Sequence, residues 1–251
     1  MLADTPFAGK IHTLGTVDST SDELRRRAER GAPDGSVVVA DEQTAGRGRR
    51  GRSWHSPRGS GLYLSVLFRG IGEGPRVTRW TLGAGLAACL ACRRVAPAPI
   101  EIDWPNDLVC GGRKLGGILT ELRGRSELVV GTGINLELDA QRLPSELAPL
   151  VTSLSEAAGR IMLDREALAT EYLRELARVA AALRGGDFAS LAREWLELAP
   201  GARGRRVRVL TPSAVRGTTV GVDESGALLV RLVDGETVAV RMVDAVEPDE
   251  D

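Results

Sequence analysis

Residues 104–122 read WPNDLVCGGRKLGGILTEL, and this stretch decides much of the fold. Short apolar runs lie on both sides of Gly111-Gly112, a glycine pair that is typical of a tight hairpin turn. We therefore predict two paired strands, Leu108–Cys110 and Lys114–Leu122. Pro105 interrupts the segment before them because proline has no N–H to donate to a sheet, so the polar residues that follow it should lie at a strand end.

Outward from this hairpin, the chain alternates between strand-like and helix-like apolar patterns. Apolar runs predict further strands at Ser36–Gln43, Gly61–Phe68, Ile100–Trp104 and Glu127–Leu136. Helical spacing predicts helices at Thr78–Val95, Asp164–Leu183 and Asp187–Leu198, and Thr16–Ala28 is expected to be a loop that enters a helix. This mixture of elements indicates an α+β fold.

The C-terminal part of the chain has a different residue pattern. Segment Pro200–Gly204 has the composition of a linker, and short β patterns separated by Asp-Glu-Ser-Gly and Asp-Gly-Glu turns follow it. We therefore predict two domains, residues 1–200 and residues 201–251, of which the second is a small β-barrel or sandwich.

The bulk composition bounds the function. The formal net charge is −1 over 251 residues, so any attraction for anions must be local. The longest apolar stretch, Leu82–Cys92, is too short to span a bilayer, and the first residues lack the pattern of a secretion signal. Three cysteines, a low and odd number, favour a reducing, cytoplasmic setting.

Two short patterns inside the predicted helix Thr78–Val95 are interpreted structurally. Cys89 and Cys92 form a C-x-x-C, but no second pair accompanies them and the chain has only two histidines. We interpret them as buried helix cysteines rather than as zinc ligands or a redox pair. The glycines of Gly83–Ala88 are interpreted as positions of close packing.

The segment GRGRRGRSWHSPRGSG, residues 46–61, contains five arginines and no acidic residue. Its glycines let the backbone approach a ligand, and its arginines offer forked donors for carboxylate or phosphate. A solvated basic loop is the competing interpretation, but Trp54 favours a ligand site because an aromatic ring can cover an apolar ligand. A dinucleotide-binding turn is rejected, because Ser53–Pro57 is a poor helix start.

Two other stretches each allow a ligand contact and a structural alternative. Lys114 enters an apolar, glycine-flanked strand, where an unpaired charge is costly, so either a bound anion or an exposed hairpin edge would explain it. Gly131 and Gly133 interrupt the strand GTGINLEL, which indicates either a ligand or backbone passing close by, or a β-bulge. The sequence leaves both pairs of alternatives open.

These segments, in this order, resemble the signature of the biotin–protein ligase family. The family pattern is G-R-G-R-x-G-R-x-W, then K-W-P-N-D with R/K-K-x-G-G-I-L, then G-x-G-I-N. It corresponds here to Gly46–Trp54, Trp104–Leu119 and Gly131–Asn135. The segments Asp18–Thr20 and Thr152–Leu154 and the residue Gln43 also fit, so the resemblance extends from about residue 12 to residue 200.

The resemblance implies a fold and an activity. The family fold is a mixed β-sheet flanked by helices, related to class II aminoacyl-tRNA synthetases, and the tail resembles the family's small SH3-like C-terminal β-barrel. The implied enzyme uses ATP and Mg²⁺ to form biotinyl-5′-AMP. It then passes biotin to a lysine of a carrier protein, by family default the biotin carrier subunit of acetyl-CoA carboxylase.

The resemblance also implies roles for individual residues. The implied catalytic cations are Arg47, Arg49 and Lys114. The implied biotin-binding residues are Ser19, Thr20, Ser21, Gln43, Arg47, Gly48, Arg49, Lys114, Gly117, Gly131 and Ile134. The implied ATP and adenylate contacts are Arg47, Arg49, Arg52, Trp54, Asn106, Lys114 and Asn135. Asp107 is a candidate for a proton-transfer or metal role, and no metal site made by protein ligands alone is expected.

One departure from the pattern stands at Asp103, where the family usually has lysine. A carboxylate there would weaken a phosphate site by direct repulsion. Asp103 could point away from the site, help to hold a metal, or reduce the activity. The sequence does not decide between these three.

Three other functions compete with this one. A ligase for lipoate or another acyl acid shares the adenylate chemistry, but it needs no donors for a ureido group. Nucleic-acid binding is disfavoured because the basic charge is confined to one loop and no helix-turn-helix precedes the first motif, so we expect a ligase without repressor activity. A pure interaction module leaves the motifs unexplained. No membrane partner is expected, and a homodimer stays open because family members often dimerise through sheet edges.

Overall fold

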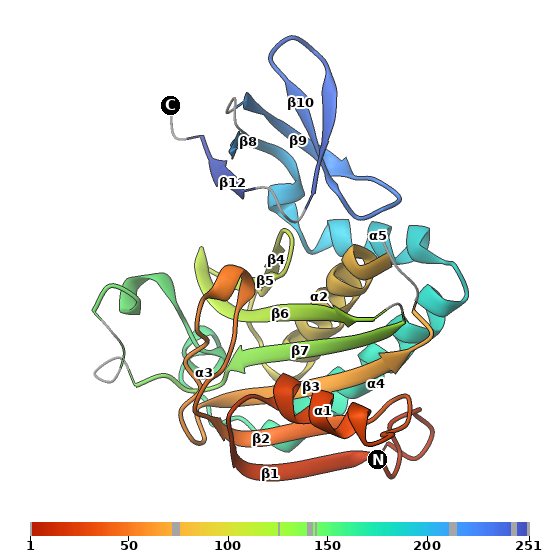
Figure 1. Ribbon diagram of the computed structural model, residues 1–251. Helices are drawn as coiled ribbons and strands as arrows, with labels where there is room; N and C mark the ends of the chain where they lie inside the picture. Colours follow the sequence, from red (N-terminus) through yellow and green to blue (C-terminus); the bar gives the residue numbers. More distant parts are fainter. Residues whose placement is uncertain are drawn as a thin grey trace.

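The computed structural model describes residues 2–71, 76–124, 126–139, 143, 145–210, 215–241 and 245–249. Its elements form two parts: a large part with helices and strands, and a smaller part made of strands alone (Figure 1). The strands of the large part are β1 (Ile11–Val17), β2 (Val37–Gln43), β3 (Gly61–Arg69), β4 (Glu101–Asp103), β5 (Asp107–Cys110), β6 (Arg113–Arg123) and β7 (Glu127–Asn135). Its helices are α1 (Thr20–Glu29), α2 (Arg76–Val95), α3 (Leu154–Ala157), α4 (Arg165–Arg184) and α5 (Phe188–Glu197).

The large part is built on one seven-stranded sheet in the order β1-β2-β3-β7-β6-β5-β4. β1 runs parallel to β2, and the other neighbouring strands are antiparallel, so the predicted mixed sheet is confirmed. The sequence interpretation missed β1, because this strand lies at the sheet edge and most of its side chains are exposed, so it has no buried apolar face to recognise.

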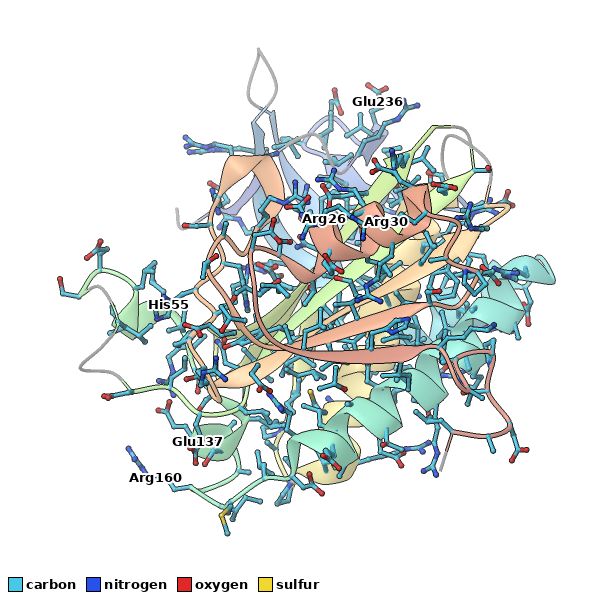
Figure 2. The ribbon with its side chains drawn as sticks, turned by 60° about the horizontal axis from the view of Figure 1, so that its bottom comes forward. Arg26, Arg30, His55, Glu137, Arg160 and Glu236 are labelled. Atoms are coloured by element: carbon cyan, nitrogen blue, oxygen red, sulfur yellow. The ribbon has the colours of Figure 1, made fainter. Side chains whose placement is uncertain are left out.

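Helices cover both faces of this sheet. Val37 and Val66 belong to the main core with α2 and α4, whereas the next residues along β2 and β3, Val38 and Leu67, pack with Leu24 of α1. Alternation along each strand therefore assigns α1 to one face and α2 and α4 to the other, as Figure 1 shows. Figure 2 shows Arg26 on α1 and Arg30 directly after the end of this helix.

The glycine and cysteine patterns of α2 are structural, as predicted. A Cβ added at Gly83 would lie 2.6 Å from Val179 Cγ1, so the missing side chain lets α2 approach α4 closely. Cys89 and Cys92 are buried and free, and burial raises the pKa of the Cys89 thiol to about 11. No group of three or more metal-ligating side chains occurs among the described residues.

The smaller part is a five-stranded antiparallel sheet in the order β11-β10-β9-β8-β12. Its strands are β8 (Arg203–Leu210), β9 (Val215–Val222), β10 (Leu228–Leu232), β11 (Thr237–Val240) and β12 (Ala245–Pro248). The predicted C-terminal β domain is confirmed. Within the described strands, β11 and β12 are open edges and no pairing between them closes a barrel.

The prediction of a linker at Pro200–Gly204 is wrong. Pro200–Ala202 forms a short 3-10 helix, Ala202 is buried, and β8 begins at Arg203. The two parts pack directly, because Trp104 Nε1 donates to the carbonyl of Gly226 in the turn after β9, at 3.2 Å. Glycine and proline in this segment therefore mark a tight, packed turn rather than a flexible connection. None of the described helices has the length and apolar character needed to cross a membrane.

Candidate active site

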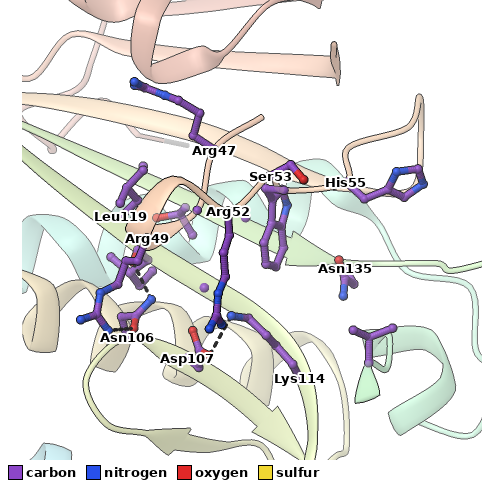
Figure 3. Close-up of a pocket in the computed structure, with 18 of the residues that line it drawn as sticks. Arg47, Arg49, Arg52, Ser53, His55, Asn106, Asp107, Lys114, Leu119 and Asn135 are labelled. Carbon is purple, nitrogen blue, oxygen red and sulfur yellow. Dashed lines mark hydrogen bonds and ion pairs between the residues drawn. The ribbon is translucent and has the colours of Figure 1, made fainter. Parts of the chain in front are cut away.

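A cavity of about 570 Å³ opens beside the ends of β5, β6 and β7 and the start of α1 (Figure 3). It collects segments that are far apart in the sequence. The predicted site residues that line it are Ser19, Thr20, Ser21, Gln43, Arg47, Gly48, Arg49, Arg52, Trp54, Asn106, Asp107, Lys114, Gly117, Gly131 and Asn135. The cavity thus joins the Gly/Arg segment, the WPND segment and the GTGIN strand.

One end of the cavity is formed by the first turn of α1. Ser19 is the N-cap residue, and its side chain accepts the N–H of Asp22. The backbone N–H of Thr20 donates to Gln43 Oε1 at 2.9 Å, and the Thr20 hydroxyl donates to the same oxygen at 3.1 Å. Ser19, Thr20 and Ser21 are almost inaccessible to solvent, so this end is polar but buried.

The floor of the cavity depends on glycines in β7. A Cβ at Gly131 would lie 2.8 Å from Ser21 Oγ, and one at Gly133 would lie 2.6 Å from Trp54 Nε1. Both residues pair in regular register with β3 and β6, so close approach explains these glycines and a β-bulge does not. Gly133 in particular lets the Trp54 indole lie directly on the sheet.

The other end of the cavity is lined by charged side chains. Lys114 Nζ is 2.7 Å from Asp107 Oδ2 and lies 5.6 Å from the centre of the Trp54 ring. Asp107 Oδ1 and Trp54 Nε1 are buried and have no hydrogen-bond partner in the described part of the chain. An unpaired buried polar atom is costly, so these two atoms indicate that a ligand completes the site.

The arginines of the Gly/Arg segment are held in different ways. Arg49 Nη1 donates to Asn106 Oδ1 at 2.7 Å, and Asn106 is fixed in turn by donating to the Ile118 carbonyl. Burial lowers the pKa of the Arg49 guanidinium, and the charge of Arg50 adds to that shift. Arg47 instead forms ion pairs with acidic residues at 2.8 Å and 3.1 Å. Its partners are Glu121 and Asp22.

Asp103, the departure from the family pattern, also lines the cavity. Its Oδ1 is 2.9 Å from Arg205 Nη1 of β8, in the C-terminal sheet. Burial raises the pKa of the Asp103 carboxyl, and the charge of Arg205 opposes that shift. The carboxylate therefore faces the Arg205 cation while it lines the cavity.

One residue differs from the sequence interpretation. The Ile134 side chain is fully buried in the core on the far face of β7 and is not part of the cavity lining. Its predicted contact with a ligand through this side chain is therefore not supported, since side chains alternate along a strand. Asn135 lines the cavity as predicted, and its Nδ2 donates to the Thr152 carbonyl.

Sequence reasoning missed other residues of the site. Apolar side chains from the segment after β7 line one wall, namely Leu138, Leu143, Leu147, Leu150 and Val151. Ser65 of β3 lies behind Thr20 and Ser21 and bonds to both hydroxyls, at 2.8 Å and 3.0 Å. A serine in the otherwise apolar run LYLSVLF was the available signal for Ser65.

Comparison with known proteins agrees with this geometry. Residues 15–139 match the Biotin/lipoate A/B protein ligase family, and residues 203–242 match the Biotin protein ligase C terminal domain. The chain is 34% identical over 244 residues to the biotin–[acetyl-CoA-carboxylase] ligase of Mycobacterium tuberculosis, covering 94% of this chain and 88% of that protein.

Two other similarities cover most of the chain. The bifunctional ligase/repressor BirA of Bacillus subtilis is 33% identical over 227 residues, which are 88% of this chain and 68% of that protein. The structure of the biotin protein ligase of Aquifex aeolicus in complex with biotin and ATP superimposes with a TM-score of 0.84 at 28% identity. That match covers 96% of this chain and 100% of the other.

Proposed function

The chain belongs to the biotin protein ligase family, and from that premise we propose how its own residues carry out the reaction. The enzyme activates biotin with ATP and transfers the biotinyl group to a lysine of a biotin-accepting carboxylase protein. The observation that carries the assignment is one cavity with a buried, hydroxyl-lined end and a cationic end. A neutral polar ring with a carboxylate tail fits these two ends in one orientation only.

We propose that the ring end of biotin lies against Ser19, Thr20, Ser21 and Gln43. These side chains offer hydrogen-bonding atoms in a nearly dry environment, where a ring with N–H and C=O groups gains from each bond it completes. Gly117 and Gly131 leave room for the ring over the sheet. Trp54, which lies on Gly133, covers the apolar part of the ligand.

In the first step the biotin carboxylate oxygen attacks the α-phosphorus of ATP, and pyrophosphate leaves. Both reactants are anions, so positive charge and alignment lower the barrier. Lys114 and Arg49 are placed at this end of the cavity and provide that charge. Arg47 joins them when it exchanges Glu121 and Asp22 for phosphate oxygens. Arg52 and Asn106 contribute further donors.

Mg²⁺ on the triphosphate of ATP would add charge to this site. We propose that the ion arrives with the nucleotide, because Mg²⁺ is commonly bound by substrate phosphates together with one or two carboxylates. Asp107 fits a contact with it, because Oδ1 of this residue is buried and without a partner, whereas Oδ2 holds Lys114.

In the second step the carrier lysine amine attacks the acyl carbon of biotinyl-5′-AMP, and AMP leaves. The amine must lose a proton, and Asp107 is the proposed acceptor, because it lines the cavity and its Oδ1 has no hydrogen-bond partner among the described residues. The adenylate is a mixed anhydride that water hydrolyses. Residues 46–54 flank the cavity and are proposed to close over it during the reaction.

Further proposals concern the domain boundaries, the acceptor protein, the cellular location and the oligomeric state. We propose catalytic and C-terminal domains at residues 1–200 and 201–251, with the direct contact through Trp104 and Gly226 joining them. The acetyl-CoA carboxylase biotin carrier subunit is the proposed acceptor, by analogy with the relatives that carry its name. A cytoplasmic location and a homodimer joined at sheet edges are proposals of the same kind.

The decisive experiment is incubation with α-labelled ATP, Mg²⁺ and one acid at a time: biotin, lipoate or octanoate. We expect labelled adenylate with biotin only, followed by loss of label from the adenylate when an acceptor domain with its lysine is added. Label transfer to an adenylate with lipoate or octanoate, and none with biotin, would overturn the assignment in favour of a sister acyl ligase.

A further inference from the structure

Ser65 occupies an unusual place for a polar residue. It lies in the centre of β3, a strand whose residues from Gly61 to Phe68 are all buried, and its own exposed fraction is 0%. Its Oγ lies 2.8 Å from Thr20 Oγ1 and 3.0 Å from Ser21 Oγ. Ser65 itself does not line the cavity, whereas both of its hydroxyl partners do.

One backbone group fixes the direction of every hydrogen bond in this network. The N–H of Thr20 can only donate, so the Gln43 atom that faces it at 2.9 Å must be the carbonyl oxygen Oε1. The opposite amide orientation would also bring the Gln43 NH₂ group against that N–H. Gln43 Nε2 instead donates to Ser56 Oγ at 2.8 Å, and Ser56 Oγ donates to the Trp54 carbonyl.

The direction of the Thr20–Gln43 bond then determines which hydroxyl donates in each of the next hydrogen bonds. Thr20 Oγ1 is 3.1 Å from Gln43 Oε1, an oxygen that only accepts, so the single Thr20 hydroxyl proton is donated there. The bond between Thr20 and Ser65 must therefore be donated by Ser65. Because the only hydroxyl proton of Ser65 is now committed, the bond between Ser65 and Ser21 must be donated by Ser21.

These hydrogen-bond directions determine what the hydroxyl groups at the cavity surface can offer to a ligand. Thr20 and Ser21 have both committed their hydroxyl protons to the protein, so each presents only a lone pair to a ligand. Two buried acceptors side by side recognise N–H donors and are left unsatisfied by oxygen atoms at the same positions. Hydroxyl groups that could turn freely would accept either kind of partner.

We propose that Ser65 is a positioning residue that sets this polarity and thereby makes the site selective for a ring bearing N–H donors. The inference rests on the proposed function, in which the ligand is biotin and its ureido ring carries two N–H groups. Ser65 touches no substrate. It acts by accepting the Ser21 proton and donating its own to Thr20.

The test compares biotin with cyclic carbamate analogues, in which an oxygen replaces one or the other ureido N–H. Dissociation constants are measured by calorimetry for the wild type and for Ser65→Ala. The wild type should discriminate strongly against at least one carbamate. Ser65→Ala frees the Ser21 hydroxyl to donate, so biotin should bind roughly tenfold more weakly and the discrimination should fall at least as much.

Thr81→Val is the matched control. Thr81 is also fully buried and bonds to another hydroxyl, that of Thr120 at 2.5 Å, but neither residue lines the cavity. This variant should lose stability while its ratio of affinities for biotin and carbamate stays at the wild-type value. In Ser65→Ala the biotin KM should rise while the single-turnover rate of adenylation at saturation changes little.

Ser65→Cys covers the case in which the alanine variant fails to fold. Cysteine is close to serine in shape, and its S–H is a weak donor. The discrimination of Ser65→Cys should therefore lie between that of the wild type and that of Ser65→Ala. If Ser65→Ala does not fold, the discrimination of Ser65→Cys should still be lower than that of the wild type. Unchanged discrimination in the folded variants would overturn the proposal. A wild-type protein that binds no biotin at all would instead overturn the proposed function.

Discussion

At the closed end of the cavity, Thr20, Ser21 and Ser65 are between 0% and 5% exposed and are bonded to one another. At the open end, the side chains of Lys114 and Asp107 are 35% and 31% exposed and form an ion pair. The closed end therefore holds its geometry before a ligand arrives. At the open end, by contrast, a nucleotide must compete with protein carboxylates for the cations.

This difference has a physical cause. Hydrogen bonds between neutral hydroxyl groups act only at short range and can form within the protein itself. The ring of the ligand is therefore recognised by hydroxyl groups that are already in place. A phosphate binds mainly through charge, and unpaired cations at an empty site would repel one another. Arg47, Lys114 and Asp103 each have an oppositely charged partner that stabilises the protein without nucleotide. We expect substitutions at the open end to affect adenylation and those at the closed end to affect ring affinity.

The largest effect is expected for Lys114→Ala. Loss of the charge at the reacting anions should slow adenylate formation by roughly a hundredfold or more, with a much smaller change in the affinity for biotin's ring. Single-turnover measurement of biotinyl-5′-AMP formation provides the rate. The chain's other lysine offers a control, since Lys10→Ala lies outside the cavity and should behave as wild type. A Lys114→Ala variant with a normal adenylation rate would refute the assigned role.

A smaller effect is expected for Arg49→Gly. The variant loses the bond that ties the Gly/Arg segment to Asn106 and gains backbone freedom, so closure over the adenylate weakens. We expect release of biotinyl-5′-AMP to rise by roughly tenfold, on the scale of a lost charge-assisted hydrogen bond. Released adenylate would biotinylate lysines of bystander proteins, which blotting with streptavidin detects.

Arg58→Ala is the control for that experiment, because Arg58 lies in the same basic segment but pairs with Asp41 and Glu42 away from the cavity. Hydrogen exchange across residues 46–54, with and without biotin and ATP, measures closure itself. Equal exchange in both states, with no rise in bystander labelling, would show that the segment does not act as a lid.

The Asp103–Arg205 pair should give an effect of a few fold. Arg205→Ala leaves the Asp103 carboxylate without its cation at the cavity wall, so we expect the ATP KM to rise by roughly threefold, a modest value because both side chains are partly exposed. Asp103→Asn in the same background should return the KM to the wild-type value. An additive double mutant, with no restoration, would show that the pair does not influence nucleotide binding.

The smallest effect concerns stability at the entrance to α1. Hydrogen bonding to Arg26 lowers the pKa of Asp18 from 3.8 to about 2. A depressed folded-state pKa stabilises the protein fully above pH 3.8, and this contribution is lost as the pH falls toward 2. Because Asp18 is largely solvated, Asp18→Asn should cost less than about 1 kcal/mol at neutral pH. Urea unfolding at pH 7 and pH 3 should show the difference between variant and wild type shrinking at the lower pH.

The sequence predicted the strongly patterned parts of the fold. The hairpin around Gly111-Gly112, the buried strand β3 and the helix α2 have clear apolar periods, and the structure confirms them. The exposed edge strand β1 and the packed turn Pro200–Ala202 were missed or misread, because local composition does not reveal what packs against a segment.

By itself, the sequence determined which glycines and cations gather at the site, because they stand in motifs whose order is specific to one family. It did not identify the apolar wall or Ser65. Tertiary structure alone decided how the site residues are partnered. Asp103 faces Arg205 from 102 positions away, and Ser65 reaches Thr20 across 45 positions. Partners so distant in the chain are chosen by how sheets and helices pack. Sequence spacing predicts contacts only within one element, so neither the charge of Asp103 nor the hydroxyl polarity of the site could be inferred from it.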